Sequence, residues 1–239
     1  MDRYSVGASA AAVLGVAWYL RRRRARRSET FQPMRLSELP SSPHPLLGKW
    51  LADAEERLGS VEARFMVVAT CSPTEGATAR TVLLQSVGDE GLLFGSNSDS
   101  LKARTIAEDA RVEAVLRWGQ RQVRVRGDCE VMLGDAAACD RIFDGLPSGA
   151  RLGLGLLKQG ARVDEAAYDG IRSRFDELGG AKGGGGEVLR PVDYAAFCIR
   201  PRCVEFYSGG HPGYVNDRFL YVARGSHGQG GWDLCRLQA

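Results

Sequence analysis

Segments with strand character come in pairs along this 239-residue chain, and this pairing restricts the possible folds more than any other feature. Residues 79–87 and 91–97 are joined through a Gly-Asp-Glu-Gly turn, and residues 111–118 and 121–133 through a second short turn. Strands joined by short turns are antiparallel, whereas parallel strands need a long crossover. A doubly wound parallel sheet is therefore not expected, and no Gly-x-Gly-x-x-Gly motif follows a strand.

The other segments predict a mainly β, α+β protein, an antiparallel Greek-key-like barrel with peripheral helices. Further strands are expected at 64–71, 195–208, 218–225 and 231–238, and helices at 45–60, 98–109, 135–145 and 164–178. The 98–109 helix opens with an N-cap pattern. Residues 179–187 hold six glycines and predict a loop. The glycine-spaced segment 153–160 follows a helix, so it is weak evidence for a nucleotide loop.

The first 35 residues are expected to lie outside the fold. Residues 5–20 are apolar and uncharged, and an arginine-rich run at 21–27 follows them. A helix of this length spans about 24 Å, which snorkelling arginines extend toward the ~30 Å of a bilayer core. We expect a membrane anchor with a cytosolic body; a mitochondrial targeting segment and a tail without function are the alternatives. The expected divisions are this segment at 1–35, a linker at 36–44 and the folded domain at 45–239.

Charge and cysteine usage exclude two classes of function. The net charge of +3 comes from the N-terminal segment, which holds eight arginines and two acidic residues. The rest of the chain has 24 basic and 27 acidic residues (32 minus 8, and 29 minus 2), so nucleic acid is not an expected partner. Six scattered cysteines without a Cys-x-x-Cys motif, and three isolated histidines, predict no metal site.

The segment 121–127 has an unusual polar face. Gln122, Arg124 and Arg126 alternate with Val123 and Val125, which predicts a half-buried strand. Its polar face either meets solvent and forms salt bridges with acidic side chains or binds a ligand. The sequence of this segment alone favours the first interpretation.

Five ordered motifs change that balance. The segment "ARTVLLQSVGDEGLLFGSNSDSLKARTIAED", the strand "RQVRVRG", the segment "GARLGLGLLKQGARV", the pair "VEFYSG" and "NDRFLY", and the terminal "GWDLCRL" occur in this order over residues 45–239. Together they resemble the pyridoxamine 5′-phosphate oxidase family. The resemblance implies a split β-barrel, a homodimer and bound FMN, with the polar face of 121–127 meeting the flavin across the dimer interface.

The cofactor residues follow from the resemblance and from the chemistry of FMN. A phosphate dianion favours fixed cations and helix N-terminal amides, which Arg80, Lys102, Ser96 and Ser100 can supply. Gln122, Gln159 and Arg218 are the candidates for the flavin ring, with Arg218 near the side where negative charge grows on reduction. Asp217 either orients Arg218 through a bidentate pair or has a purely structural role. The implied cofactor-binding residues are Arg80, Thr81, Val82, Leu83, Leu84, Gly95, Ser96, Lys102, Gln122, Gln159, Tyr207 and Arg218.

The chain departs from the family pattern where the substrate phosphate is held. The family has a lysine at the position of Gln85, and a tyrosine, an arginine and a serine at Ile142, Leu146 and Ala150. With Leu154 these residues predict a less polar substrate pocket. Leu101 and Tyr207 replace an arginine and a tryptophan on the flavin side, and the "YVNDR" segment leaves Tyr214, Asn216 and Arg218 as the catalytic candidates.

We therefore expect an FMN-dependent oxidoreductase that transfers hydride from a small amine or alcohol to FMN, with O2 as acceptor. Pyridoxal phosphate synthesis is not favoured, because the contacts to the substrate phosphate are replaced. The alternatives are a flavin-binding module without turnover, tethered to a membrane, and a haem- or deazaflavin-binding relative.

Overall fold

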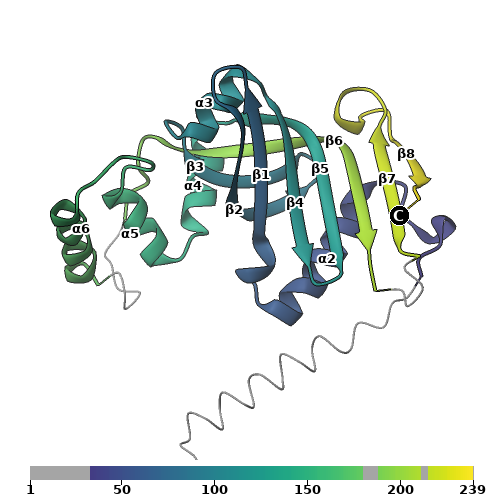
Figure 1. The fold of residues 1–239 in the computed structure, drawn as a ribbon, viewed down its shortest axis with the longest axis horizontal. Helices are drawn as coiled ribbons and strands as arrows, with labels where there is room; N and C mark the ends of the chain where they lie inside the picture. The colour runs from purple at the N-terminus through teal and green to yellow at the C-terminus, as the bar shows by residue number, and fades with distance from the viewer. Residues whose placement is uncertain (1–32, 180–187, 211–214, 239) are drawn as a thin grey trace, which may run out of the picture.

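The computed structural model describes residues 33–179, 188–210 and 215–238, which form one antiparallel sheet rolled into a barrel with helices around it (Figure 1). The sheet order is β3-β2-β1-β4-β5-β6-β7-β8, and an additional β3–β6 pairing closes the first six strands. Because β4 returns beside β1, the first four strands have Greek-key order. The strands are β1 (Phe65–Ser72), β2 (Gly76–Gly88), β3 (Gly91–Asn97), β4 (Arg111–Trp118), β5 (Arg121–Val131), β6 (Tyr194–Ser208), β7 (Asp217–Ala223) and β8 (Trp232–Arg236). The predicted antiparallel barrel is confirmed.

Alternation of side chains along the strands builds the core. Met66 and Val68 on β1 and Val123 and Val125 on β5 are fully buried inside the barrel, while their sequence neighbours face outward. Trp50 closes one end, with its ring edge-on to Phe206 at 5.2 Å between centroids. The sequence pattern therefore decides which face of each strand the barrel encloses.

The described part of the chain has five α-helices, some packed on the barrel and some extending from it. They are α2 (Pro43–Leu58), α3 (Leu101–Glu108), α4 (Ala136–Asp144), α5 (Ser148–Leu156) and α6 (Glu165–Glu177). Figure 1 shows α4, α5 and α6 stepping away from the barrel on one side, with β7 and β8 on the other. Helix α3 begins at Leu101 rather than at residue 98, because the Ser100 side chain accepts from the Ala103 amide and caps it.

Helix α5 was not predicted. Gly153 and Gly155 lower the helix propensity of this segment, and they obscured its pattern. The helix buries Leu152 and packs against α6. Tertiary contacts therefore outweigh the weak local preference.

The stretch predicted as a linker at 36–44 is packed on the domain. It contains a short 3-10 helix at Leu36–Glu38 and the first two residues of α2. The Met34 amide donates to Asp217 Oδ2 at 2.7 Å, and the Tyr221 hydroxyl donates to the Pro40 carbonyl at 2.9 Å. The predicted anchor at residues 5–20 lies outside the described residues. Among the helices that the structure describes, none has the length and apolar character needed to cross a membrane.

Candidate functional site

The barrel is parted between β2 and β3, and a cleft of about 510 Å³ lies at this seam. The two strands pair from Gly88 opposite Gly91 up to Leu84 opposite Phe94, beyond which β2 pairs only with β1 and β3 only with β6. Backbone groups on the parted edges are thus not used in a β2–β3 ladder. The residues that line the cleft are Thr81, Val82, Leu83, Gly95, Ser96, Asn97, Lys102, Leu146, Ala150, Gly153, Leu154, Leu157, Gln159 and Tyr194.

Lys102 provides the charge of this cleft, and it is the single charged residue among the described residues that line it. Its position in the first turn of α3 buries it to 5 % exposure. The ammonium donates to Ser96 Oγ at 2.6 Å, Ser100 Oγ at 3.2 Å and Gln159 Oε1 at 3.3 Å. Burial and then the nearby Arg80 charge lower the pKa of Lys102 to about 8.

Arg80 lies behind Lys102, on the inward face of β2. Its guanidinium donates to neutral acceptors, which are Val68 O at 3.1 Å, Thr70 Oγ1 at 2.9 Å and Thr78 Oγ1 at 2.7 Å. Burial lowers the pKa of Arg80. No carboxylate in the described part of the chain lies within ion-pairing distance of Arg80 or Lys102, so these two cations form an electropositive end that an anion can neutralise.

The opposite wall of the cleft is apolar and comes from α5 and the α4–α5 turn. Leu146, Ala150, Leu154 and Leu157 follow one another at helical spacing along this wall. Of the other predicted pocket residues, Ile142 is 4 % exposed and lies against Gly95. Gln85 lies near Gly145 at the end of α4. Among the described residues that line this end of the cleft, none is a cation that could pair with a phosphate group.

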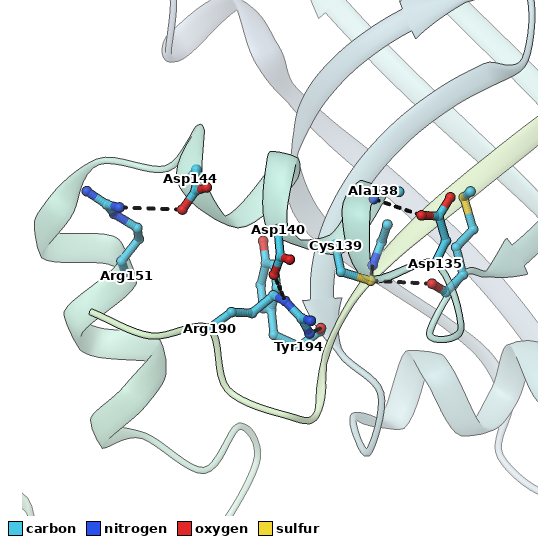
Figure 2. Close-up of polar contacts among 10 residues, drawn as sticks. Asp135, Ala138, Cys139, Asp140, Asp144, Arg151, Arg190 and Tyr194 are labelled. Carbon is cyan, nitrogen blue, oxygen red and sulfur yellow. Dashed lines mark hydrogen bonds and ion pairs between the residues drawn. The ribbon is translucent and has the colours of Figure 1, made fainter. Parts of the chain in front are cut away.

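Polar contacts hold α4 and α5 in place beside this wall (Figure 2). Cys139 Sγ accepts from the Ala196 amide and donates to the Met132 carbonyl, both at 3.3 Å. Arg190 bonds Asp140 at 2.6 Å and the Tyr194 carbonyl at 2.9 Å, and Arg151 pairs with Asp144 at 3.7 Å. The wall is therefore tied to β6, and its position is fixed relative to the seam.

Three other predicted residues form a separate strip on the outer face of the sheet. Gln122 lies opposite Tyr207, which lies opposite Arg218, across β5, β6 and β7. Arg218 donates to both oxygens of Glu205, at 3.0 and 3.1 Å, and this hydrogen-bonded pair raises the pKa of Arg218. The expected partner Asp217 instead bonds Arg236 and the Met34 amide, because its side chain points to the opposite face.

The strip and the cleft are far apart in one chain. Ser96 of the cleft pairs with Ala195 of β6, and Gln122 of the strip pairs with Tyr207, twelve residues further along the same strand (207 minus 195). At ~3.3 Å per residue this is on the order of 40 Å of strand. The strip and the cleft therefore lie at opposite ends of β6 within one protomer.

The structure thus divides the predicted site residues. The seam gathers Thr81, Val82, Leu83, Gly95, Ser96, Lys102, Gln159, Leu146 and Ala150, with Arg80 behind them. Leu84 is fully buried inside the barrel, Asn216 precedes β7, and Tyr214 lies outside the described residues. The sequence did not indicate Asn97, Gly153, Leu157 or Tyr194, which also line the cleft. The β3–β6 pairing that brings Tyr194 to the seam joins segments about a hundred residues apart, and no local pattern reports it.

These features define a class: a split-barrel protein whose seam has an electropositive end and an apolar end. A sequence profile described as "Pyridoxamine 5′-phosphate oxidase" matches residues 53–152. A pyridoxine/pyridoxamine 5′-phosphate oxidase of Salmonella paratyphi B is 33 % identical over 215 residues, which cover 89 % of this chain and 93 % of the relative. One of Rubrobacter xylanophilus is 32 % identical over 207 residues, covering 85 % and 90 %. The chain belongs to the pyridoxamine 5′-phosphate oxidase family.

Two solved structures have the same fold. PhzG from Burkholderia lata 383, in complex with tetrahydrophenazine-1-carboxylic acid, has a TM-score of 0.74 at 21 % identity, covering 88 % of this chain and 98 % of its own. A pyridoxamine 5′-phosphate oxidase-related, FMN-binding protein from Nostoc punctiforme PCC 73102 has a TM-score of 0.64 at 18 % identity, covering 83 % and 98 %. At these identities the likeness concerns the fold alone.

Proposed function

We propose that this protein is an FMN-dependent oxidoreductase that acts as a homodimer on a substrate without a phosphate group. The observation that carries the proposal is a pair of cations at the barrel seam, buried Lys102 and partly buried Arg80, for which the described residues supply no carboxylate partner. A buried cation without a counter-charge is unfavourable in the protein alone, and an anionic ligand relieves that cost. The family and its FMN-binding structural neighbour support FMN as that ligand.

The residues at the seam fit FMN. Lys102, with Ser96 and Ser100 beside it, would hold the phosphate, and Arg80 would strengthen the positive potential there. Gln159 and the parted backbone edges of β2 and β3 offer hydrogen bonds to the ring and the ribityl chain. Asn97 Oδ1 is buried and has no hydrogen-bond partner in the described part of the chain. This oxygen can therefore accept a hydrogen bond from a donor group of the ligand.

Bound FMN supplies a two-electron acceptor for a hydride from a substrate carbon, and O2 can take the electrons onward to give hydrogen peroxide. The protein's part is to position the reactants and to exclude water. The apolar wall of Leu146, Ala150, Leu154 and Leu157 excludes water from the substrate side. The replaced phosphate contacts and this apolar wall support an uncharged, apolar substrate rather than a phosphate ester.

A second copy of the chain would complete the site. Gln122, Tyr207 and Arg218 lie at the end of β6 remote from the seam, on a partly exposed outer face. A two-fold dimer can bring this strip to the partner's seam and form two equivalent sites. Glu205 holds the Arg218 guanidinium in a fixed orientation for that contact.

FMN binding tests the first part of the proposal. Purified full-length protein should bind FMN at one equivalent per chain and show flavin absorption. Lys102→Met should weaken binding about 10- to 100-fold, since a charged hydrogen bond contributes ~1.5–3 kcal/mol. Lys49→Met, which removes a surface lysine paired with Asp53, is the matched control. Haem or deazaflavin binding in place of FMN would refute the cofactor assignment.

Subunit complementation tests whether two chains form each site. Lys102→Met and Arg218→Met should each show weakened FMN binding at every site when expressed alone, whereas co-expression should restore wild-type affinity to about one quarter of the sites, because half of the dimers then hold one intact site. Arg200→Met, which breaks a comparable arginine–glutamate pair elsewhere on β6, should retain FMN. If both variants lose FMN and mixing restores none, the site lies within one chain.

The replaced substrate contacts also support a second candidate, a flavin-binding module without turnover. Anaerobic reduction and peroxide release over a panel of amines and alcohols separate the two. Substrate-dependent bleaching of the flavin supports the enzyme. A flavin that no member reduces supports the module.

A further inference from the structure

Tyr194 places a phenol hydroxyl at the floor of the cleft, beside its apolar wall. The side chain is 2 % exposed and lines the cleft from the first position of β6. No hydrogen bond to this hydroxyl occurs within the described part of the chain, whereas Lys102, Ser96 and Gln159 at the other end bond one another. The apolar end therefore contains one strong donor that the fold itself does not use.

The ring of Tyr194 is fixed in position. Its edge packs on Phe143 of α4, with 5.3 Å between ring centroids and an interplanar angle of 68°. Its amide donates to the Pro191 carbonyl at 3.0 Å, and its carbonyl accepts from Arg190 at 2.9 Å (Figure 2). Little conformational freedom remains to be lost when a ligand accepts from the hydroxyl.

Gly95 leaves the space that this hydroxyl occupies. A methyl group on Gly95 would overlap the Tyr194 hydroxyl and lie 2.9 Å from Ile142 Cγ2. Its φ needs no glycine, since it is not among the positive-φ residues. Glycine is therefore needed at position 95 to leave room for the Tyr194 hydroxyl, and the backbone conformation there does not require it.

We infer that Tyr194 is a specificity-determining residue that donates a hydrogen bond to the substrate, and that the substrate is an uncharged planar ring carrying one acceptor, a ring nitrogen or a carbonyl oxygen, at its inner end. This inference rests on the proposed function and deepens it. An apolar wall selects the ring, and a lone donor penalises a ring without an acceptor, because the hydroxyl would then be buried unpaired. Burial, and to a lesser extent the Cys139 thiol, raises the pKa of Tyr194 to about 12, so the phenol stays protonated and acts as a donor.

Quinoline and naphthalene are suitable probes, since they differ only in one ring nitrogen. Calorimetry on the FMN-loaded full-length protein should show quinoline binding about 3- to 10-fold more tightly than naphthalene, the range expected for one neutral hydrogen bond. Tyr194→Phe should abolish this preference and leave naphthalene affinity and FMN content unchanged. Gly95→Ala should reduce the preference as well, because it displaces the hydroxyl.

Tyr221→Phe is the matched control, because Tyr221 is a buried tyrosine whose hydroxyl bonds Pro40 away from the cleft. It should keep the preference. A preference that survives Tyr194→Phe, no preference in the wild type, or tightest binding by pyridoxine 5′-phosphate would each overturn the inference. Repeating the titrations without FMN distinguishes the two proposals. If the protein does not bind FMN but still prefers quinoline through Tyr194, the role of Tyr194 as a donor is supported and the assignment of FMN as cofactor is wrong.

Discussion

Lys102 shows how a single residue can be placed for function at the cost of stability. It is 5 % exposed, and its ammonium has neutral oxygens around it and the like charge of Arg80 nearby. A charge in such a place lowers the free energy of unfolding of the protein without its ligand. The residue belongs to the network of Ser96 and Gln159, so the same arrangement that destabilises the empty site prepares it for an anion.

Lys102→Met should therefore stabilise the cofactor-free protein at pH 7. The folded-state pKa of about 8 lies below the ordinary 10.5, so the folded protein carries the full cost of the charge below pH 8 and loses it as the pH rises toward 10.5. The variant should exceed the wild type by about 3 kcal/mol at pH 7, and the difference should shrink to near zero above pH 10.5. Urea denaturation of both proteins across this range measures it. A difference that does not change with pH would contradict the assignment.

At the same scale, sequence reasoning reached the polar end of the site and missed part of the other. Lys102 and Ser96 share a turn and a helix start, so their proximity follows from local structure. Gln159 needed the family pattern, since it lies 57 residues from Lys102. Neither local structure nor the family pattern indicated Tyr194, because its position at the seam depends on the pairing of β3 with β6.

At the scale of elements, the sequence predicted the strands better than the irregularities that shape them. The alternation of apolar and polar residues predicted the strand segments. It did not predict the register shift in the β5–β6 pairing between Arg126 and Gly127, because a bulge does not change the alternation along β5. The missed helix α5 is a second case, where packing on α6 decides the outcome. The break lies between the part of β6 that pairs with β3 (residues 194–199) and the part that pairs with β7 (residues 203–208).

Gly127→Ala tests the importance of this bulge. A methyl group there would overlap the Arg200 carbonyl on β6 and lie 3.1 Å from Pro201 Cα, and backbone atoms cannot move aside as a side-chain end can. We expect a loss of about 2–4 kcal/mol in the free energy of unfolding, measured by urea denaturation. Gly134→Ala, where a methyl group would meet nothing within 4 Å, should change it by less than ~1 kcal/mol. Equal effects of the two substitutions would show that the bulge does not depend on Gly127.

At the scale of the whole molecule, the outer face of the sheet is where the proposed dimer would join the two halves of each site. Phe65 and Val67 on β1 are 49 % and 42 % exposed, although they lie in the middle of the barrel wall. Val67 pairs in register with Val115, and Val115 pairs with Arg124. Arg124 pairs with Glu205, which lies beside the strip of Gln122, Tyr207 and Arg218. An apolar patch continuous with half of the proposed site favours a second copy of the chain as its partner.

Val67→Arg should therefore dissociate the dimer and abolish FMN binding in the same step, because a charge would be buried unpaired at the interface and each seam would lose its partner's strip. Light scattering coupled to size exclusion measures the mass, and flavin absorbance of the same peak measures the cofactor. Val61→Arg is the matched control, because Val61 is 50 % exposed but precedes β1 and lies off this face. This variant should remain a dimer and retain FMN. A monomeric Val67→Arg protein that retains FMN would place the whole site in one chain, and a dimeric one would exclude this face as the interface.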